Sequence, residues 1–374
     1  MVWSNGGGFM AEAAVIPATN GVSDVRLGAA AVVTLDRGGA LNALTPAMVA
    51  RLDGCYRRFA RDANLYVVIL KSADAKAFCA GGDVRALSAL ARTDLAAARD
   101  ALRAEYGLNW LHECFSKPTV AFIDGFVMGS GVGISAYATH RVAGPRYRFG
   151  MPETAIGFFP DVGAAYGLAR LPHHMGRYIG LTGHSIERAD AYALGLVTHC
   201  LEREKFGEIE AGLAEAWPVD PLLDERHRDP GPAPLMVHAE AIDHCFSAAR
   251  VEEVLERLEG VRGGSEPFAQ KALADLRTRS PLALKVALRH ITEAGALDLR
   301  QTLEVDYRLG CRFMAVADFH EGVRAALIDK DHTPKWLPAA LSDVTKSELD
   351  DLFAAMPSAE LNLPLRQEMQ HMRV

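Results

Sequence analysis

The sequence has no long apolar run, no cluster of cysteines and no excess of basic residues. No stretch approaches the roughly 18 uninterrupted apolar residues that suggest a membrane span, so we expect no membrane partner. The six cysteines stand singly, without a C-x-x-C pair or metal-ligand spacing, which predicts reduced core thiols and no metal site. A net charge of −7 provides no basic face, so we expect no nucleic-acid partner.

The N-terminus also lacks the features of a targeting segment. Its first 20 residues have no basic region followed by an apolar core and no Arg-rich amphipathic stretch. We therefore expect a flexible tail over residues 1–24 and a cytoplasmic location. Apolar residues, by contrast, are plentiful: 49% of the 374 residues are hydrophobic and 23% are charged. This composition is typical of a well-cored protein that is too long for one minimal domain.

The first part of the chain alternates between strand-like and helix-like patterns. β-branched or apolar runs at 29–36, 65–72 and 118–125 predict strands, and apolar residues at helical spacing predict helices at 46–62, 94–116 and 131–140. Alternation of this kind implies parallel strands joined by crossover helices. We therefore expect an α/β layer structure over the first two-thirds of the chain.

Beyond this core the strand patterns fade. A stretch rich in Pro, Asp and Arg at 217–234 is typical of a linker. The helical patterns that follow lie at 251–260, 266–280, 282–295 and 299–317. We expect residues 206–374 to form a mostly helical region that packs on the core.

Two glycine turns each follow a strand and precede a helix, in KAFCAGGDVRAL (76–87) and DGFVMGSGVGISAY (124–137). The second turn fails the G-x-S-x-G nucleophile motif because position 128 is Met128, and its glycines lack the spacing of a dinucleotide fingerprint. Backbone amides at a helix start can face an anionic oxygen. The two turns therefore predict a pair of converging N–H donors, as in an oxyanion hole for acyl chemistry.

Two acids, Glu153 and Asp161, lie downstream in the apolar segment FGMPETAIGFFPDVG (149–163). They are either solvated loop residues or groups that face a pocket and perform acid–base chemistry. The sequence pattern alone leaves both alternatives open.

Together these stretches resemble the enoyl-CoA hydratase/isomerase (crotonase) superfamily in order and spacing. KPTVAFIDGFVMGSGVGISAYATHRVAG, RFGMPETAIGFFPDVGAAYGLARL and GLTGHSIERADAYALGLVTH carry the resemblance, and DFHEGVRAALIDKDHTPKW (318–336) resembles its 3-hydroxyisobutyryl-CoA hydrolase branch. The resemblance implies an α/β fold, a crotonase-like spiral of ββα units over residues 25–205, with a helical C-terminal region. It also implies an acyl-CoA substrate, with no cofactor besides the CoA that is part of that substrate.

The resemblance further implies roles for five residues. The amides of Gly82 and Ser130 would form the oxyanion hole, Glu153 would be the nucleophile or general base, and Asp161 would orient water or the substrate hydroxyl, or share a proton with Glu153. Glu105 would contact the polar end of the substrate. Whether Glu153 acts through an anhydride or through an activated water stays open.

Position 133 distinguishes two reactions within this superfamily. The resemblance implies a second catalytic glutamate there in hydratases, whereas this chain has Gly133. We therefore expect a thioester hydrolase for 3-hydroxyisobutyryl-CoA or a close relative, in valine catabolism. The alternatives are an enoyl-CoA hydratase or isomerase, and a silent binding protein on the same scaffold. The assembly is expected to be either a trimer or hexamer, or a monomer.

Overall fold

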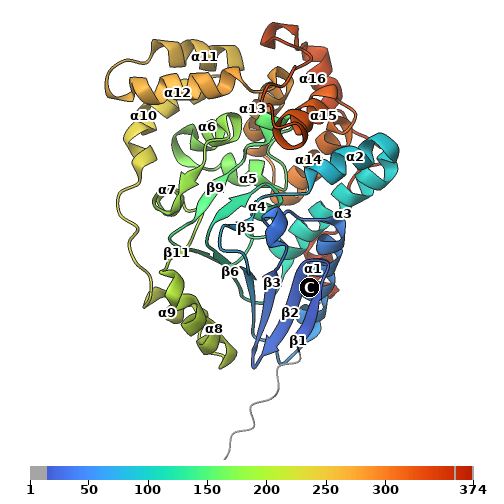
Figure 1. The fold of residues 1–374 in the computed structure, drawn as a ribbon, viewed down its shortest axis with the longest axis vertical. Coiled ribbons are helices and arrows are strands. Elements are labelled where there is room, and N and C mark those ends of the chain that lie inside the picture. Colours follow the sequence, from blue (N-terminus) through green and yellow to red (C-terminus); the bar gives the residue numbers. More distant parts are fainter. Residues whose placement is uncertain (1–14, 358, 373–374) are drawn as a thin grey trace, which may run out of the picture.

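The computed structural model describes residues 15–357 and 359–372, which form two β-sheets surrounded by helices (Figure 1). The larger sheet has the strand order β1-β2-β3-β4-β6-β8-β11, and the smaller has the order β10-β9-β7-β5. The strands of the larger sheet are β1 (Val15–Thr19), β2 (Val22–Leu27), β3 (Ala30–Leu35), β4 (Val67–Ser72), β6 (Thr119–Ile123), β8 (His140–Ala143) and β11 (His199–Cys200). Those of the smaller are β5 (Ala77–Cys79), β7 (Phe126–Met128), β9 (Arg148–Gly150) and β10 (Ile186–Glu187).

The expected parallel arrangement is confirmed for the centre of the larger sheet. From β3 to β11 neighbouring strands pair in parallel. The helix α1 (Pro46–Arg61) connects β3 to β4, and α2 (Val84–Thr93) and α3 (Leu95–Cys114) lie between β5 and β6. Thr45 caps α1 by accepting a hydrogen bond from the Met48 amide at 3.2 Å. The α/β class is therefore confirmed.

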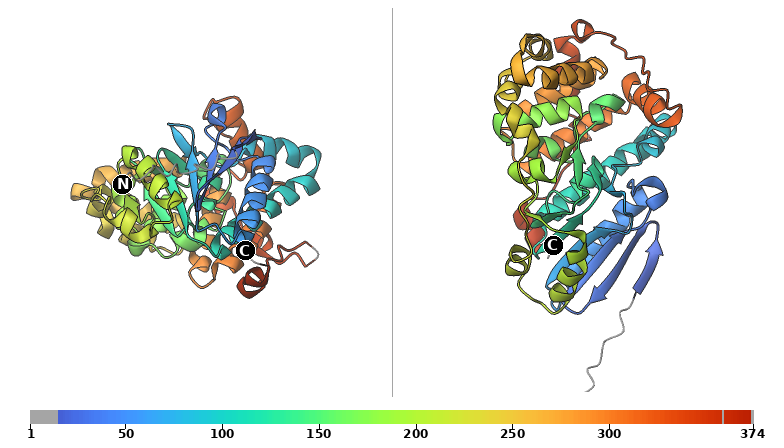
Figure 2. Two further views of the ribbon diagram at one scale, coloured as in Figure 1. Left: turned by 90° about the horizontal axis from the view of Figure 1, so that it is seen from below. Right: turned by 60° about the vertical axis from the view of Figure 1, so that its left-hand side comes forward.

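Helices cover both faces of this sheet. On one face Ala31 and Val33 pack with buried residues of α1 and α3. On the other face Ala30 and Val32 pack with α8 (Phe206–Ala214) and α9 (Val219–Asp224). In Figure 1, and in the right-hand view of Figure 2, the olive α8 and α9 lie beside the sheet, away from the other helices. A strand buried on both faces explains why the sequence of β3 is almost wholly apolar.

The predicted tail of residues 1–24 is wrong for its last ten residues. Residues 1–14 lie outside the described part of the chain, but β1 and β2 form an antiparallel hairpin. Asn20 and Gly21 turn this hairpin with φ angles of 61° and 81°. An Asn-Gly pair between two apolar runs favours this left-handed turn because neither residue is much strained by a positive φ.

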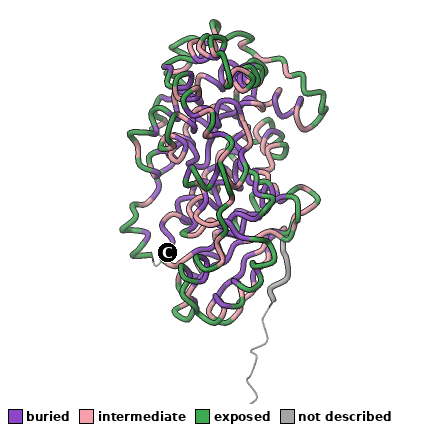
Figure 3. Tube along the Cα trace, turned by 90° about the vertical axis from the view of Figure 1, so that its left-hand side faces the viewer, coloured by how far each residue is buried: buried purple, intermediate pink, exposed green. Residues whose placement is uncertain are grey.

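After β11 the described residues contain helices and no further strand. Besides α8 and α9 they include α10 (Ala239–Phe246), α11 (Val251–Gly260), α12 (Glu266–Arg277), α13 (Pro281–Ala294), α14 (Leu299–Phe313), α15 (Ala317–Val323) and α16 (Lys346–Phe353). α14 packs on α3, and α13 packs on α6 (Met175–Thr182). Buried positions, purple in Figure 3, run through the middle of the molecule, and exposed positions, green, lie mostly at its outline.

All six cysteines are free and buried, as the sequence predicted. Burial raises the pKa of the Cys79 thiol to about 12, and that of Cys55 to about 11. Among the described residues, no helix is both long and apolar enough to cross a membrane.

Candidate active site

The smaller sheet explains how distant glycines and acids come together. β5, β7 and β9 are adjacent and parallel, with Val127 of β7 opposite both Cys79 and Phe149. Because the carboxyl ends of parallel strands meet at one edge of a sheet, the segments that follow these three strands are neighbours. Gly82, Ser130 and Glu153 lie on those three segments.

The two expected oxyanion donors lie side by side. A Cβ placed on Gly82 would be 2.9 Å from the hydroxyl oxygen of Ser130. Asp83 caps α2 by accepting a hydrogen bond from the Ala86 amide at 3.1 Å, which fixes the turn just after Gly82. Within residues 15–357 and 359–372, neither the Gly82 nor the Ser130 amide has a hydrogen-bond acceptor. Two unpaired amides side by side are suited to binding a carbonyl oxygen that becomes negative.

The helix expected at 131–140 is wrong in length, because α4 spans only Ser130–Gly133. Close packing requires its glycines. A Cβ on Gly131 would lie 2.4 Å from the Cys79 carbonyl oxygen, and one on Gly133 would lie 2.7 Å from Nδ2 of the buried Asn109. Glycine disfavours a longer helix, and the chain turns towards β8 instead.

Glu153 begins the short 3-10 helix Glu153–Ile156 after β9 and is only 8% exposed. Its Oε1 atom would lie 3.1 Å from a Cβ on Gly129, the residue before Ser130. Its Oε2 atom is buried and has no hydrogen-bond partner in the described chain. Burial raises the pKa of the Glu153 carboxyl from 4.5 to about 8. Such a group can both take up and release a proton near neutral pH.

Asp161 is also buried, and accepts a hydrogen bond from the hydroxyl of Tyr106 on α3 at 2.7 Å. Burial, followed by the charges of Glu105 and Glu153, raises its pKa well above 3.8. The Glu105 pKa is raised by burial as well, an effect that the Ser130 side chain opposes. Because Glu153 and Asp161 are both buried, the alternative of solvated loop acids is wrong for them. The effect of the Glu105 and Glu153 charges on Asp161 indicates that the three acids are neighbours.

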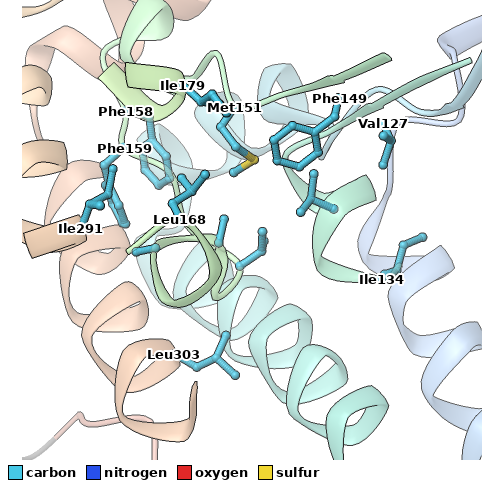
Figure 4. Close-up of a cluster of buried hydrophobic side chains, with 14 of the residues drawn as sticks. Val127, Ile134, Phe149, Met151, Phe158, Phe159, Leu168, Ile179, Ile291 and Leu303 are labelled. Atoms are coloured by element: carbon cyan, nitrogen blue, oxygen red, sulfur yellow. The ribbon is translucent and has the colours of Figure 1, made fainter. Parts of the chain in front are cut away.

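The aromatic and apolar residues around the two acids face the core. Figure 4 shows Phe158, Phe159 and Met151 packed with Leu168 and Ile291. Phe158 and Phe159 stack with their ring centroids 4.6 Å apart. The segment that carries Glu153 and Asp161 is therefore held in place by the packing of its own apolar side chains.

The turn after Asp161 has an unusual backbone. Val162 and Gly163 have φ angles of 54° and 75°. A positive φ is a true outlier for a β-branched residue and costs on the order of 1–3 kcal/mol. The hydroxyl of Tyr137 donates to the Val162 carbonyl at 2.9 Å, and Asp306 on α14 accepts from the Gly163 amide at 2.6 Å.

Sequence reasoning missed Tyr106, Tyr137 and Asp306. Tyr106 directly follows Glu105 on the same helix, and this neighbourhood was the only signal in the sequence that connected Tyr106 with the site. Asp306 lies 143 residues after Gly163 within an ordinary amphipathic pattern, and nothing in the sequence connects the two. In the described ranges, no group of three His, Cys, Asp or Glu side chains could hold a metal ion.

A family model described as enoyl-CoA hydratase/isomerase matches residues 30–353. The chain belongs to this family. Among curated members of the enoyl-CoA hydratase/isomerase family, the mitochondrial 3-hydroxyisobutyryl-CoA hydrolase of Rattus norvegicus is 40% identical, over 90% of this chain and 89% of its own length. The protein of the same name from Homo sapiens is 39% identical, over 89% and 88%.

Solved structures agree on the crotonase fold of this family. A carnitinyl-CoA dehydratase from Mycobacterium thermoresistibile superposes with a TM-score of 0.87, at 34% identity, over 92% of this chain and 99% of the other. An enoyl-CoA hydratase from Rhodobacter sphaeroides superposes with a TM-score of 0.85, also at 34% identity, over 92% of this chain and 100% of the other. The predicted fold and family are confirmed.

Proposed function

We propose that this protein hydrolyses the thioester of 3-hydroxyisobutyryl-CoA, or of a closely related short hydroxyacyl-CoA, to the free acid and CoA. The observation that carries the proposal is that the amides of Gly82 and Ser130, which have no hydrogen-bond acceptor in the described part of the chain, lie close to the buried carboxyl of Glu153. Relatives that are 39–40% identical over about nine tenths of the chain carry the hydrolase name.

In the proposed reaction, the oxygen of water ends on the acyl carbon and the C–S bond breaks. The Gly82 and Ser130 amides donate to the carbonyl oxygen as it becomes negative; loss of one such donor costs about 3 kcal/mol. Ionised Glu153 attacks the carbonyl itself or takes a proton from the attacking water. A proton returned from a carboxyl group converts the leaving thiolate to the CoA thiol.

Asp161 is the second acid in this scheme. Because its pKa is raised by burial and by Glu105 and Glu153, these carboxyls share protons and do not all ionise together near neutral pH. We assign Asp161 to orienting the water or the substrate hydroxyl, and Glu105 to the polar end of the acyl group. No cofactor is required for these steps.

Hydration of an enoyl-CoA is the second candidate, since the two solved structures at 34% identity carry hydratase and dehydratase names. Position 133 speaks against it. Besides the missing carboxylate, a Cβ on Gly133 would lie 2.7 Å from Asn109 Nδ2 and 2.8 Å from the Val162 Cβ atom. This backbone therefore leaves no room for a second acid at that position.

The deciding experiment measures free CoA thiol released from 3-hydroxyisobutyryl-CoA by the wild type, by Glu153→Gln and by the exposed control Glu204→Gln. Release that only Glu153→Gln removes supports the proposal. Turnover of crotonyl-CoA at a comparable rate would instead favour the hydratase. Binding of acyl-CoA without any turnover would favour a silent binding protein.

A role in valine catabolism follows from the proposed substrate. Growth on valine after deletion of the gene for this protein tests it. A cytoplasmic location stays a prediction, and the named relatives favour mitochondria instead. Fractionation of the source cells distinguishes the two.

A further inference from the structure

The turn that carries Asp161 is held from three sides by hydrogen bonds that the proposed reaction does not use. The Tyr106 hydroxyl donates to the Asp161 carboxyl, the Tyr137 hydroxyl donates to the Val162 carbonyl, and the Gly163 amide donates to Asp306. The distances are 2.7, 2.9 and 2.6 Å, respectively. Each of the three residues of this turn, 161–163, therefore has one hydrogen bond to a distant segment.

Two features show that this turn does not keep its shape unaided. Val162 is fully buried with a φ angle of 54°, which β-branched residues avoid. Gly163 also has a positive φ, and a Cβ there would lie 2.0 Å from the Tyr137 hydroxyl. A strained backbone persists only where surrounding contacts hold it in place, and such strained residues are common at active sites.

Asp306 is itself held by a second residue of the C-terminal helices. His290 on α13 bonds through Nε2 to the Asp306 Oδ1 atom at 2.5 Å, and both side chains are fully buried. The other ring nitrogen, Nδ1, has no partner in the described chain. We therefore assign the proton to Nε2, since a buried N–H without an acceptor costs more than a bare ring nitrogen. One carboxylate thus joins α13, α14 and the Asp161 turn.

We propose that Asp306 and Tyr137 are positioning residues that fix the left-handed turn at Val162–Gly163 and so direct the Asp161 carboxyl into the active site. The helical C-terminal region then completes the site. This inference rests on the proposed function only for its kinetic effect. Small displacements of a catalytic group lower the rate of the chemical step steeply. Loss of either positioning residue should therefore lower kcat.

The test compares Asp306→Asn and Tyr137→Phe with the wild type and with Asp190→Asn. Asp190 is a matched control, because this buried carboxylate likewise accepts a hydrogen bond from a distant backbone amide, Leu235, at 2.8 Å. We expect kcat for CoA release to fall about tenfold or more in Asp306→Asn. KM should stay within about threefold, and Asp190→Asn should keep the wild-type kcat.

A double variant separates positioning from a general loss of structure. If Asp306 acts through Asp161, Asp306→Asn adds no further loss to Asp161→Asn. Losses that multiply would overturn the inference, as would a kcat within twofold of wild type in both single variants. If Asp306→Asn does not fold, Tyr137→Phe decides by the same criteria.

Hydrogen exchange gives a readout that needs no substrate. The backbone amides of residues 161–165 should exchange faster in Asp306→Asn and in Tyr137→Phe than in wild type, with β3 and β4 unchanged. Unaltered exchange in this segment would overturn the inference. A wild type that releases no CoA, together with faster exchange in the variants, would refute the proposed function while supporting the positioning of the turn.

Discussion

Replacing Glu153 by glutamine should remove activity and make the stability of the protein less dependent on pH. The wild-type carboxyl has a pKa of about 8 in the folded chain, against 4.5 for an ordinary glutamate. Between these values the unfolded chain loses the proton while the folded chain keeps it. The free energy of unfolding of the wild type therefore falls as pH rises from about 4.5 to about 8.

The size of the effect follows from the same pKa change. A pKa that moves from 4.5 to about 8 on folding corresponds to about 5 kcal/mol if it is fully realised. Glutamine has a similar shape but does not ionise, so the unfolding free energy of Glu153→Gln lacks this pH-dependent contribution. Its buried amide costs about 1–3 kcal/mol, but this cost is the same at every pH.

The assay is urea unfolding of both proteins from pH 5 to pH 9. The difference in unfolding free energy should shift by several kcal/mol in favour of Glu153→Gln across this range. The burial of Asp161 and Glu105 is common to both proteins and cancels in this difference, whereas the Glu153 charge that raises the Asp161 pKa is absent from Glu153→Gln. A difference that stays constant within about 1 kcal/mol would refute the view that burial raises the pKa of Glu153.

Three further substitutions test the site. Gly133→Ala should lower the free energy of unfolding by about 1–3 kcal/mol because the new Cβ has no room. Gly107→Ala, where a Cβ has nothing within 4 Å, should raise it by about 0.5–1 kcal/mol. Urea unfolding measures both, and equal effects would contradict the packing argument. Ser130→Ala should keep kcat within about threefold, since the backbone amide is the proposed donor; a hundredfold loss in CoA release would instead assign the role to the hydroxyl. Tyr106→Phe removes a hydrogen bond that lowers the Asp161 pKa, so Asp161 should ionise at a higher pH. The pH dependence of kcat measures this, and a midpoint that stays unchanged or moves to lower pH would contradict the contact.

The sequence predicted the elements whose patterns are long enough to show a period. The helices α1 and α3 and the strands β3, β4 and β6 all lie where apolar spacing indicated. The strands β5, β7 and β9 have three residues each and are too short to show alternation. The smaller sheet, which brings the site together, was therefore not predicted as a sheet, although the glycine turns that follow it were recognised.

In the candidate site, too, only the parts with a local sequence signal were predicted. Glycine turns and acids in an apolar segment are local signals, and the family resemblance assigned their roles. The partners of the Asp161 turn depend on tertiary packing between segments far apart in the chain, as in the bond from Gly163 to Asp306. A single sequence carries no local signal for such a contact. The N-terminal hairpin is a different case, because its Asn-Gly turn was visible and was not used.

The buried cysteines have a practical consequence for every experiment that follows CoA by its thiol. Thiol reagents react with the thiolate, and the raised pKa of all six side chains keeps them protonated as well as inaccessible in the folded protein. The folded enzyme should therefore add almost nothing to the colour that released CoA produces. On unfolding, the same six groups become reactive, so a slow background in that assay reports directly how much of the sample has lost its fold.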